Sequence, residues 1–222
     1  MTYILSIETA TKNCSVSLSL NGNTICTREV SEVGYSHAEK LHVFIEEVLK
    51  DSNIGFSDLN AIAVSQGPGS YTGLRIGVSA AKGLCYALNI PLIAIDTLEV
   101  LARKLSVENA LIIPMIDARR MECYTAIFDA NFELKREVKS EIITENSFAN
   151  ITDIIHFVGD GAPKCKEVLT DDKFIYHDEL IYPSSKEMGV IAFEKYEKSD
   201  TVDVAYFEPF YLKDFMITSA SK

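Results

Sequence analysis

The chain has 222 residues, of which 47% are hydrophobic and 24% charged, a composition typical of an ordinary folded protein rather than a disordered one. Its 32 acidic residues outnumber its 21 basic ones, which weighs against independent binding to nucleic acid because phosphate contacts need a basic surface. No apolar run reaches the roughly 18 residues that a membrane span requires. We therefore expect a cytoplasmic protein without a membrane anchor.

The first thirty residues predict a three-stranded meander. Residues 3–8 are apolar enough for a buried strand, and residues 14–20 alternate strictly between apolar and serine side chains. The dipeptide Asn21-Gly22 is a strong two-residue hairpin signal, so residues 23–29 are expected to return as the third strand.

Five scattered cysteines without a C-x-x-C pair predict reduced thiols in the cytosol. In the predicted hairpin, Cys26 lies opposite Ser17 and Cys14 lies opposite Glu29. The hairpin therefore suggests no disulfide.

A helix over residues 36–50 is predicted next, because Ser36 and Glu39 form a capping box ahead of an apolar stripe. A strand over residues 61–65 follows, and a glycine-rich turn over residues 67–73 joins it to a second helix over residues 72–88. The chain continues with a strand over residues 91–95 and a helix that starts near Asp96 or Thr97.

The second helix has an unusually bare face. At about 100° per residue, five mostly small residues fall within about 40° of one line, namely Gly73, Gly77, Ala80, Leu84 and Ala87. Leu74, Val78 and Cys85 form a second apolar flank. A helix that is apolar on two sides must be covered on both, so this face predicts the close approach of another helix, from this chain or from a partner.

Two interpretations of the glycine turn stay open. It is neither a dinucleotide-binding fingerprint nor a Walker A loop. Close packing of the backbone is favoured; the alternative is an anion site at the helix N-terminus, with Arg75 adding positive charge. The residues of that alternative site are Gly67, Gly69, Ser70, Thr72 and Arg75.

The second half repeats the first in weaker form. A buried strand over residues 111–116 ends at Asp117, a hairpin follows around residues 129–131, and the strand over residues 155–158 precedes another glycine turn. The duplication predicts a two-domain α/β protein of the actin-like, ribonuclease-H-like (ASKHA) plan, with mixed sheets flanked by helices. We predict an N-terminal domain over residues 1–106 and a smaller C-terminal domain over residues 107–222, whose tail is frayed beyond about Met216.

No catalytic set is evident from the residues. Glu8 and Asp117 end equivalent strands, where an actin-like kinase or ATPase would place Mg²⁺ and phosphate, but neither is followed by the glycine that such phosphate loops carry. Strand-end capping is therefore favoured. His37 and His42 are five residues apart, which points them about 140° apart on a helix and prevents shared metal ligation. We predict no metal site and no catalytic residue, and we expect His156 to be half-buried or in the core.

Several segments together carry a family resemblance. They are YILSIETAT at residues 3–11, SHAEKL at residues 36–41, GPGSYTGLRIG at residues 67–77, IDAR at residues 116–119 and EPFYL at residues 208–212. With these segments the chain resembles the TsaB (YeaZ) family over essentially its whole length. One departure is Glu8, where an aspartate is common in the family motif.

The resemblance implies a non-catalytic subunit of a bacterial complex that transfers a threonylcarbamoyl group to the adenosine beside the anticodon of tRNA. The implied partners are the catalytic paralogue TsaD and the ATPase TsaE, with a homodimer when the chain is alone and tRNA contacted only through the complex. ATP would be used by the complex, with no cofactor held tightly by this chain. The alternative function is an actin-like small-molecule kinase or ATPase that uses Glu8 and Asp117.

The helices over residues 36–50 and 72–88 match those through which the family pairs with TsaD. The predicted interface residues on the first helix are His37, Leu41, Phe44, Ile45 and Val48. Those predicted on the second are Gly73, Ile76, Gly77, Ala80, Leu84 and Ala87.

Overall fold

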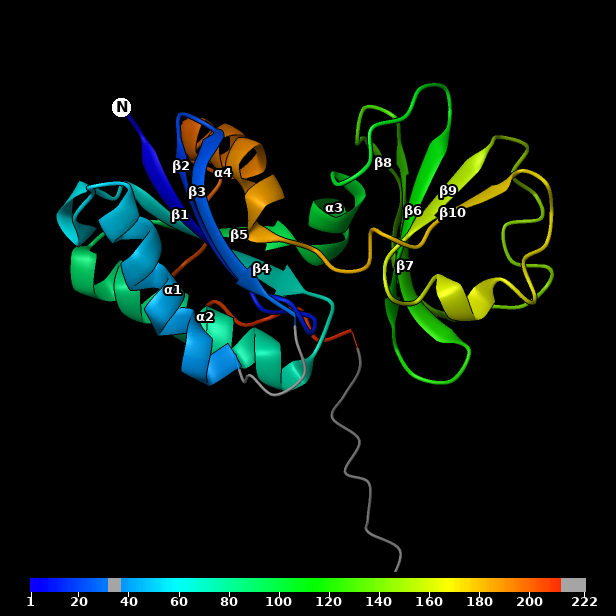
Figure 1. The fold of residues 1–222 in the computed structure, drawn as a ribbon, viewed down its shortest axis with the longest axis horizontal. Helices are drawn as coiled ribbons and strands as arrows, with labels where there is room; N and C mark the ends of the chain where they lie inside the picture. Colours follow the sequence, from blue (N-terminus) through cyan, green and yellow to red (C-terminus); the bar gives the residue numbers. More distant parts are fainter. Residues whose placement is uncertain (32–36, 213–222) are drawn as a thin grey trace, which may run out of the picture.

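The computed structural model describes residues 1–31 and 37–212, and shows two β-sheets with helices packed against them (Figure 1). The first sheet has the strand order β3-β2-β1-β4-β5. Its strands are β1 (Tyr3–Glu8), β2 (Cys14–Leu20), β3 (Asn23–Val30), β4 (Ala61–Gly67) and β5 (Leu92–Asp96). The second sheet has the order β10-β9-β6-β7-β8. Its strands are β6 (Leu111–Asp117), β7 (Glu122–Asp129), β8 (Leu134–Ile142), β9 (Ile155–Val158) and β10 (Phe174–His177).

The two sheets repeat one plan, which confirms the predicted duplication. In the first, β1 pairs antiparallel with β2 and parallel with β4; in the second, β6 pairs antiparallel with β7 and parallel with β9. The helices are α1 (His37–Asp51), α2 (Tyr71–Leu88), α3 (Thr97–Ala102) and α4 (Met188–Glu197), with short 3₁₀ turns η1 (Phe56–Asp58), η2 (Pro163–Cys165) and η3 (Ser185–Glu187). In the first half the long helix α2 follows β4, whereas in the second half only the short η2 follows β9. The repeat is therefore weak in the sequence.

Helices α1 and α2 lie along one face of the first sheet and α4 lies on the other (Figure 1). Apolar side chains of β2, such as Val16 and Leu18, point into the core shared with α1 and α2. The alternating serines face α4: Ser17 Oγ donates to the Ser185 carbonyl oxygen at 2.6 Å, and Ser15 Oγ accepts the Ser185 N–H at 2.8 Å. The serine face is thus buried, and the hydroxyls of Ser15 and Ser17 are bonded to the turn that leads into α4.

The C-terminal part of the chain returns to the first sheet. Buried residues of α4, including Met188 and Ile191, share a core cluster with Ile4 and Ile93 of the first sheet. The predicted boundary near residue 107 separates the two sheets, but α4 and the residues after it pack with the N-terminal unit instead of the second domain to which they were assigned. Their apolar partners are far away in sequence, so local patterning could not reveal this return.

Helix α3 lies between the two sheets. Its Leu98 and Leu101 share a buried cluster with Ile112, Ile116 and other residues of the second sheet. A continuous apolar contact therefore joins the two units.

The predicted hairpin register was wrong by one residue beyond a bulge. The pairing shifts between Leu18 and Ser19, so Cys26 lies opposite Leu18 and Cys14 lies opposite Val30. A bulge adds one residue to a single strand, which displaces every later pair. The predicted cap residue Ser36 and the tail beyond Met216 lie outside the described residues. None of the described helices is long and apolar enough to cross a membrane.

Candidate partner-binding surface and strand-end carboxylates

The glycine turn is packed tightly against its own chain. Three of its backbone N–H groups already have acceptors: Gly67 donates to Thr97 Oγ1 at 3.1 Å, Ser70 donates to the Ala10 carbonyl oxygen at 2.7 Å, and Gly73 donates to Ser70 Oγ at 3.3 Å. Gly67 has a φ of +118°, a conformation that favours glycine. These contacts fit the interpretation that the glycine turn allows close packing of the backbone.

The anion site remains a prediction without a supporting contact. A Cβ on Gly69 would lie 2.3 Å from the Ala10 carbonyl oxygen. The segment after β1 therefore comes so close that only glycine fits at this position. Thr72 is exposed at the start of α2. The Arg75 guanidinium lies over the Tyr71 ring, 4.8 Å from its centroid.

Two predicted interface residues on α2 are internal, which corrects the prediction. A Cβ on Gly73 would lie 2.1 Å from the Thr9 carbonyl oxygen, and one on Gly77 would lie 2.3 Å from Thr9 Oγ1. Thr9 Oγ1 also donates to the Gly73 carbonyl oxygen at 2.8 Å. The close approach that these glycines permit is therefore made by the chain's own segment after β1.

Three predicted interface residues on α1 are also internal. Leu41, Ile45 and Val48 are buried in the core beneath α1, so a partner that docks on the surface cannot reach them. Phe44 is half-buried at the edge of this core. His37 is half-buried, and its Nε2 lies 2.7 Å from the Thr11 carbonyl oxygen.

A row of residues on α2 keeps exposed surface, although two of them, Ile76 and Ala80, also pack against the core. Ile76 and Ala80 are half-buried, while Gly83 and Ala87 are exposed; we call these four residues the α2 strip. A Cβ added to Gly83 would meet no atom within 4 Å. Leu84, another predicted interface residue, is half-buried and packs against the core.

Gly83 was missing from the prediction. The helical spacing from Ile76 through residues 80 and 83 to 87 was the signal that could have found it.

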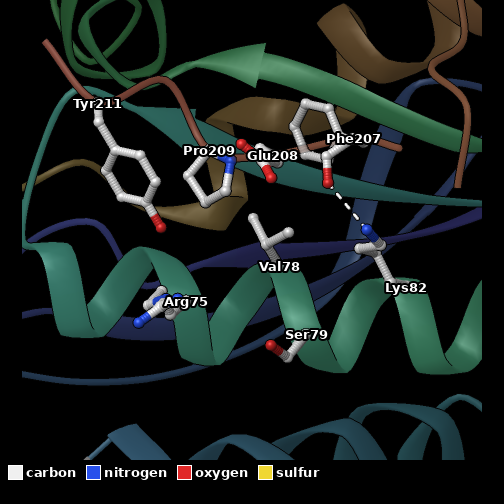
Figure 2. Close-up of a pocket in the computed structure, with 8 residues that line it drawn as sticks. All are labelled: Arg75, Val78, Ser79, Lys82, Phe207, Glu208, Pro209 and Tyr211. Atoms are coloured by element: carbon white, nitrogen blue, oxygen red, sulfur yellow. Dashed lines mark hydrogen bonds between the residues drawn. The ribbon is translucent and has the colours of Figure 1, made fainter. Parts of the chain in front are cut away.

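The C-terminal segment covers the other flank of α2. Lys82 Nζ donates to the carbonyl oxygens of Ala205 at 3.1 Å and Phe207 at 2.8 Å, and the Phe210 N–H donates to the Gln66 carbonyl oxygen at 2.7 Å. Figure 2 shows this segment running along α2, with Lys82 reaching Phe207. The EPFYL motif thus lies against the glycine turn.

A pocket of about 220 Å³ lies between α2 and this segment. Arg75 and Tyr211 line it at one end, as Figure 2 shows. The Tyr211 ring also packs on the Tyr71 ring, with 4.9 Å between their centroids. The segment therefore closes one flank of α2 and leaves the α2 strip accessible.

The two strand-end carboxylates have different environments. Glu8 is fully buried, and its Oε1 accepts the Ala10 N–H at 2.6 Å. Burial raises the Glu8 pKa from 4.5 to about 7, although hydrogen bonds from Ser65 and Ala10 oppose the shift. Asp117 is exposed and forms an ion pair with Lys164.

A second aspartate lies beside Asp117. Asp160 Oδ1 accepts the Asp117 N–H at 2.9 Å. Burial raises the pKa of Asp160, while the positive charges of Lys12 and Lys164 lower it. Of these two aspartates, Asp117 is therefore the one with an ion-pair partner among the described residues.

The described histidines form one close pair. His156 Nδ1 lies 2.8 Å from His177 Nε2, and His156 is half-buried as predicted. Among residues 1–31 and 37–212, no three His, Cys, Asp or Glu side chains are grouped so that they could hold a metal ion.

Comparison with known proteins identifies the family. The sequence model of the family described as "TsaD: tRNA N6-adenosine threonylcarbamoyltransferase" matches residues 31–216. The tRNA threonylcarbamoyladenosine biosynthesis protein TsaB of Escherichia coli K12 is 30% identical over 226 aligned positions, covering 95% of this chain and 94% of the relative.

Two solved structures are similar in fold. YeaZ from Pseudomonas aeruginosa superposes with a TM-score of 0.84 at 22% identity, covering 96% of this chain and all of that one. The ethanolamine utilization protein EutJ from Carboxydothermus hydrogenoformans gives a TM-score of 0.51 at 9% identity, covering 85% and 89% of the two chains. With the duplicated strand order, these likenesses show the actin-like, ribonuclease-H-like (ASKHA) fold. The chain belongs to the TsaB (YeaZ) family and takes part in the biosynthesis of threonylcarbamoyladenosine in tRNA.

Proposed function

We propose that this chain is a non-catalytic subunit that binds the catalytic paralogue TsaD through the α2 strip and activates it, in a complex that also contains the ATPase TsaE. The observation that carries the proposal is the α2 strip, where the small residues Gly83 and Ala87 are exposed and Ala80 is half-buried. Two helices approach most closely where their side chains are small, so this surface suits a partner's helix.

The surroundings of the α2 strip fit docking. Tyr86, next to the strip, has 86% of its surface exposed, and Val43 on the neighbouring helix α1 has 45% exposed. Exposed aromatic and aliphatic side chains beside a bare backbone provide apolar area for a contact to bury. In the absence of the paralogue, the same surface would support a homodimer.

The strand-end carboxylates support a non-catalytic role. Asp117 is ion-paired with Lys164, at the position where a kinase or ATPase of this fold would bring Mg²⁺ and phosphate. We propose that ATP is used elsewhere in the complex and that this chain holds no cofactor tightly. The net charge of −11 fits tRNA contact through the partners.

The test is a calorimetric titration of the full chain with purified TsaD, using two substitutions at one position. Gly83→Ala adds a methyl group into open space and is expected to retain binding, within about threefold. Gly83→Arg adds a long charged side chain to the α2 strip and is expected to weaken binding at least a hundredfold, because it prevents helix contact and buries a charge.

Val190→Arg on α4 is the control for added bulk and charge, because Val190 is 49% exposed on the opposite face of the sheet. This variant should bind like the unmodified chain. Wild-type affinity in Gly83→Arg would contradict docking through the α2 strip.

A further inference from the structure

Two cysteine thiols meet inside the second domain. Cys123 on β7 and Cys165 in η2 are both fully buried, and their sulfur atoms are 3.9 Å apart although 42 residues separate them in the chain. Both thiols also lie against the Gly161 carbonyl oxygen, at 3.7 Å from Cys123 Sγ and 3.3 Å from Cys165 Sγ. All five cysteines lie within the described residues and are free thiols, and the register keeps Cys14 and Cys26 apart.

The surroundings make the two thiols unequal. Lys164 precedes Cys165, and its ammonium donates to the Glu122 carbonyl oxygen at 2.7 Å. The hydrogen bond between the two thiols and the charge of Lys164 lower the pKa of Cys165, whereas the same hydrogen bond and burial raise the pKa of Cys123. Cys165 is therefore the thiol that ionises first, and the thiolate is the nucleophilic form of cysteine.

We propose that Cys123 and Cys165 are a redox modification site that forms a reversible intramolecular disulfide with hydrogen peroxide as the oxidant. The Cys165 thiolate attacks one peroxide oxygen, so that an S–O bond forms, the O–O bond breaks and hydroxide leaves, taking up a proton to become water. The Cys123 sulfur then attacks the Cys165 sulfenic acid. The S–S bond forms, the S–O bond breaks, and the Cys123 proton leaves with the hydroxide as a second water.

Closing this bond requires the two thiols to move toward each other. A disulfide brings its sulfurs to about 2.05 Å, so the two must approach by roughly 2 Å. The turn that holds Cys165 also carries Lys164, the ion-pair partner of Asp117. The disulfide would therefore form one residue away from this ion pair.

The experiment treats the reduced, full-length protein with hydrogen peroxide and measures free thiols and intact mass. The thiol count is expected to fall from five to three. The mass should fall by two hydrogens, a peptide linking Cys123 to Cys165 should appear, and dithiothreitol should reverse each change. Cys85→Ser, which removes a buried thiol elsewhere, should still form the link, whereas Cys123→Ser and Cys165→Ser should not.

A second measurement needs no variant. The oxidised wild-type protein should unfold about 5 °C or more above the reduced protein, and reduction should abolish the difference, because a disulfide restrains the unfolded chain. Oxygen addition to separate cysteines without a linked peptide would overturn the proposal. So would an equal loss of two thiols in Cys123→Ser.

Discussion

At the scale of single residues, Glu8 and Asp117 look equivalent in the sequence, but the structure gives them different burial and different neighbours. Both Glu8 and Asp117 end a central strand, as their positions predicted. The structure buries Glu8 completely, whereas Asp117 is exposed and paired with Lys164. The sequence indicated the strand ends but not the pairing, because Lys164 comes from a turn 47 residues further along.

The buried Glu8 carboxyl predicts a specific dependence of stability on pH. Its folded-state pKa of about 7 lies above the ordinary value of 4.5, so the folded protein holds this proton more tightly than the unfolded chain does. Its contribution to stability therefore falls as pH rises from about 4.5 to about 7 and is constant above that range.

Glu8→Gln removes this titration and keeps an acceptor for the Ala10 N–H. The variant should be more stable than the wild type by about 3 kcal/mol at pH 8 and by less than about 1 kcal/mol at pH 5. Urea unfolding of both proteins at several pH values measures the difference. A stability difference that does not change with pH would show that Glu8 does not titrate in this range.

At the scale of elements, α2 combines three environments that its sequence only partly distinguishes. The pattern correctly predicted a helix that needs cover on more than its sheet side. It could not predict that Gly73 and Gly77 pack against Thr9, or that residues near Phe207 return to the other flank, because both contacts join distant parts of the chain. The same limitation misassigned the buried Leu41 to a partner surface.

The two kinds of glycine on α2 predict opposite effects of the same substitution. Gly77→Ala should destabilise the chain by about 1 to 3 kcal/mol, because its methyl group meets Thr9 Oγ1 in a tightly packed contact. Gly83→Ala should be neutral or stabilise by up to about 1 kcal/mol, because the methyl group enters open space and alanine favours the helix.

Free energies of unfolding in urea compare the two variants directly. Equal destabilisation by both would contradict the different surroundings assigned to these glycines. A larger residue at Gly77 would disturb the fold of the chain itself, so a loss of binding there could not be attributed to the surface. The binding experiment therefore uses Gly83.

At the scale of the whole molecule, the duplicated plan could be predicted because each half begins with a buried strand, an acidic strand end and a hairpin. The strand order is the same in the two sheets, although the sequence patterns predicted no strand at the position of β10. The return of α4 to the first sheet was not predictable in the same way, because its contacts with Ile4 and Ile93 depend on the path of the chain through the second domain.

The partner surface could be predicted only in part. The α2 strip includes three predicted residues, Ile76, Ala80 and Ala87, and adds Gly83. The other predicted positions are buried or half-buried against the chain's own residues. Helical spacing indicates which residues share a row. It does not indicate which rows the chain itself covers.

The most direct test of the docking account is a reconstituted threonylcarbamoylation of tRNA. The reaction contains TsaD, TsaE, ATP and the threonylcarbamoyl donor, and this chain or one of its variants is added. Modification is expected to need this chain, to continue with Gly83→Ala and to fall at least a hundredfold with Gly83→Arg at the same subunit concentration. Full activity with Gly83→Arg, or with this chain left out, would contradict the claim that it activates the catalytic subunit through the α2 strip.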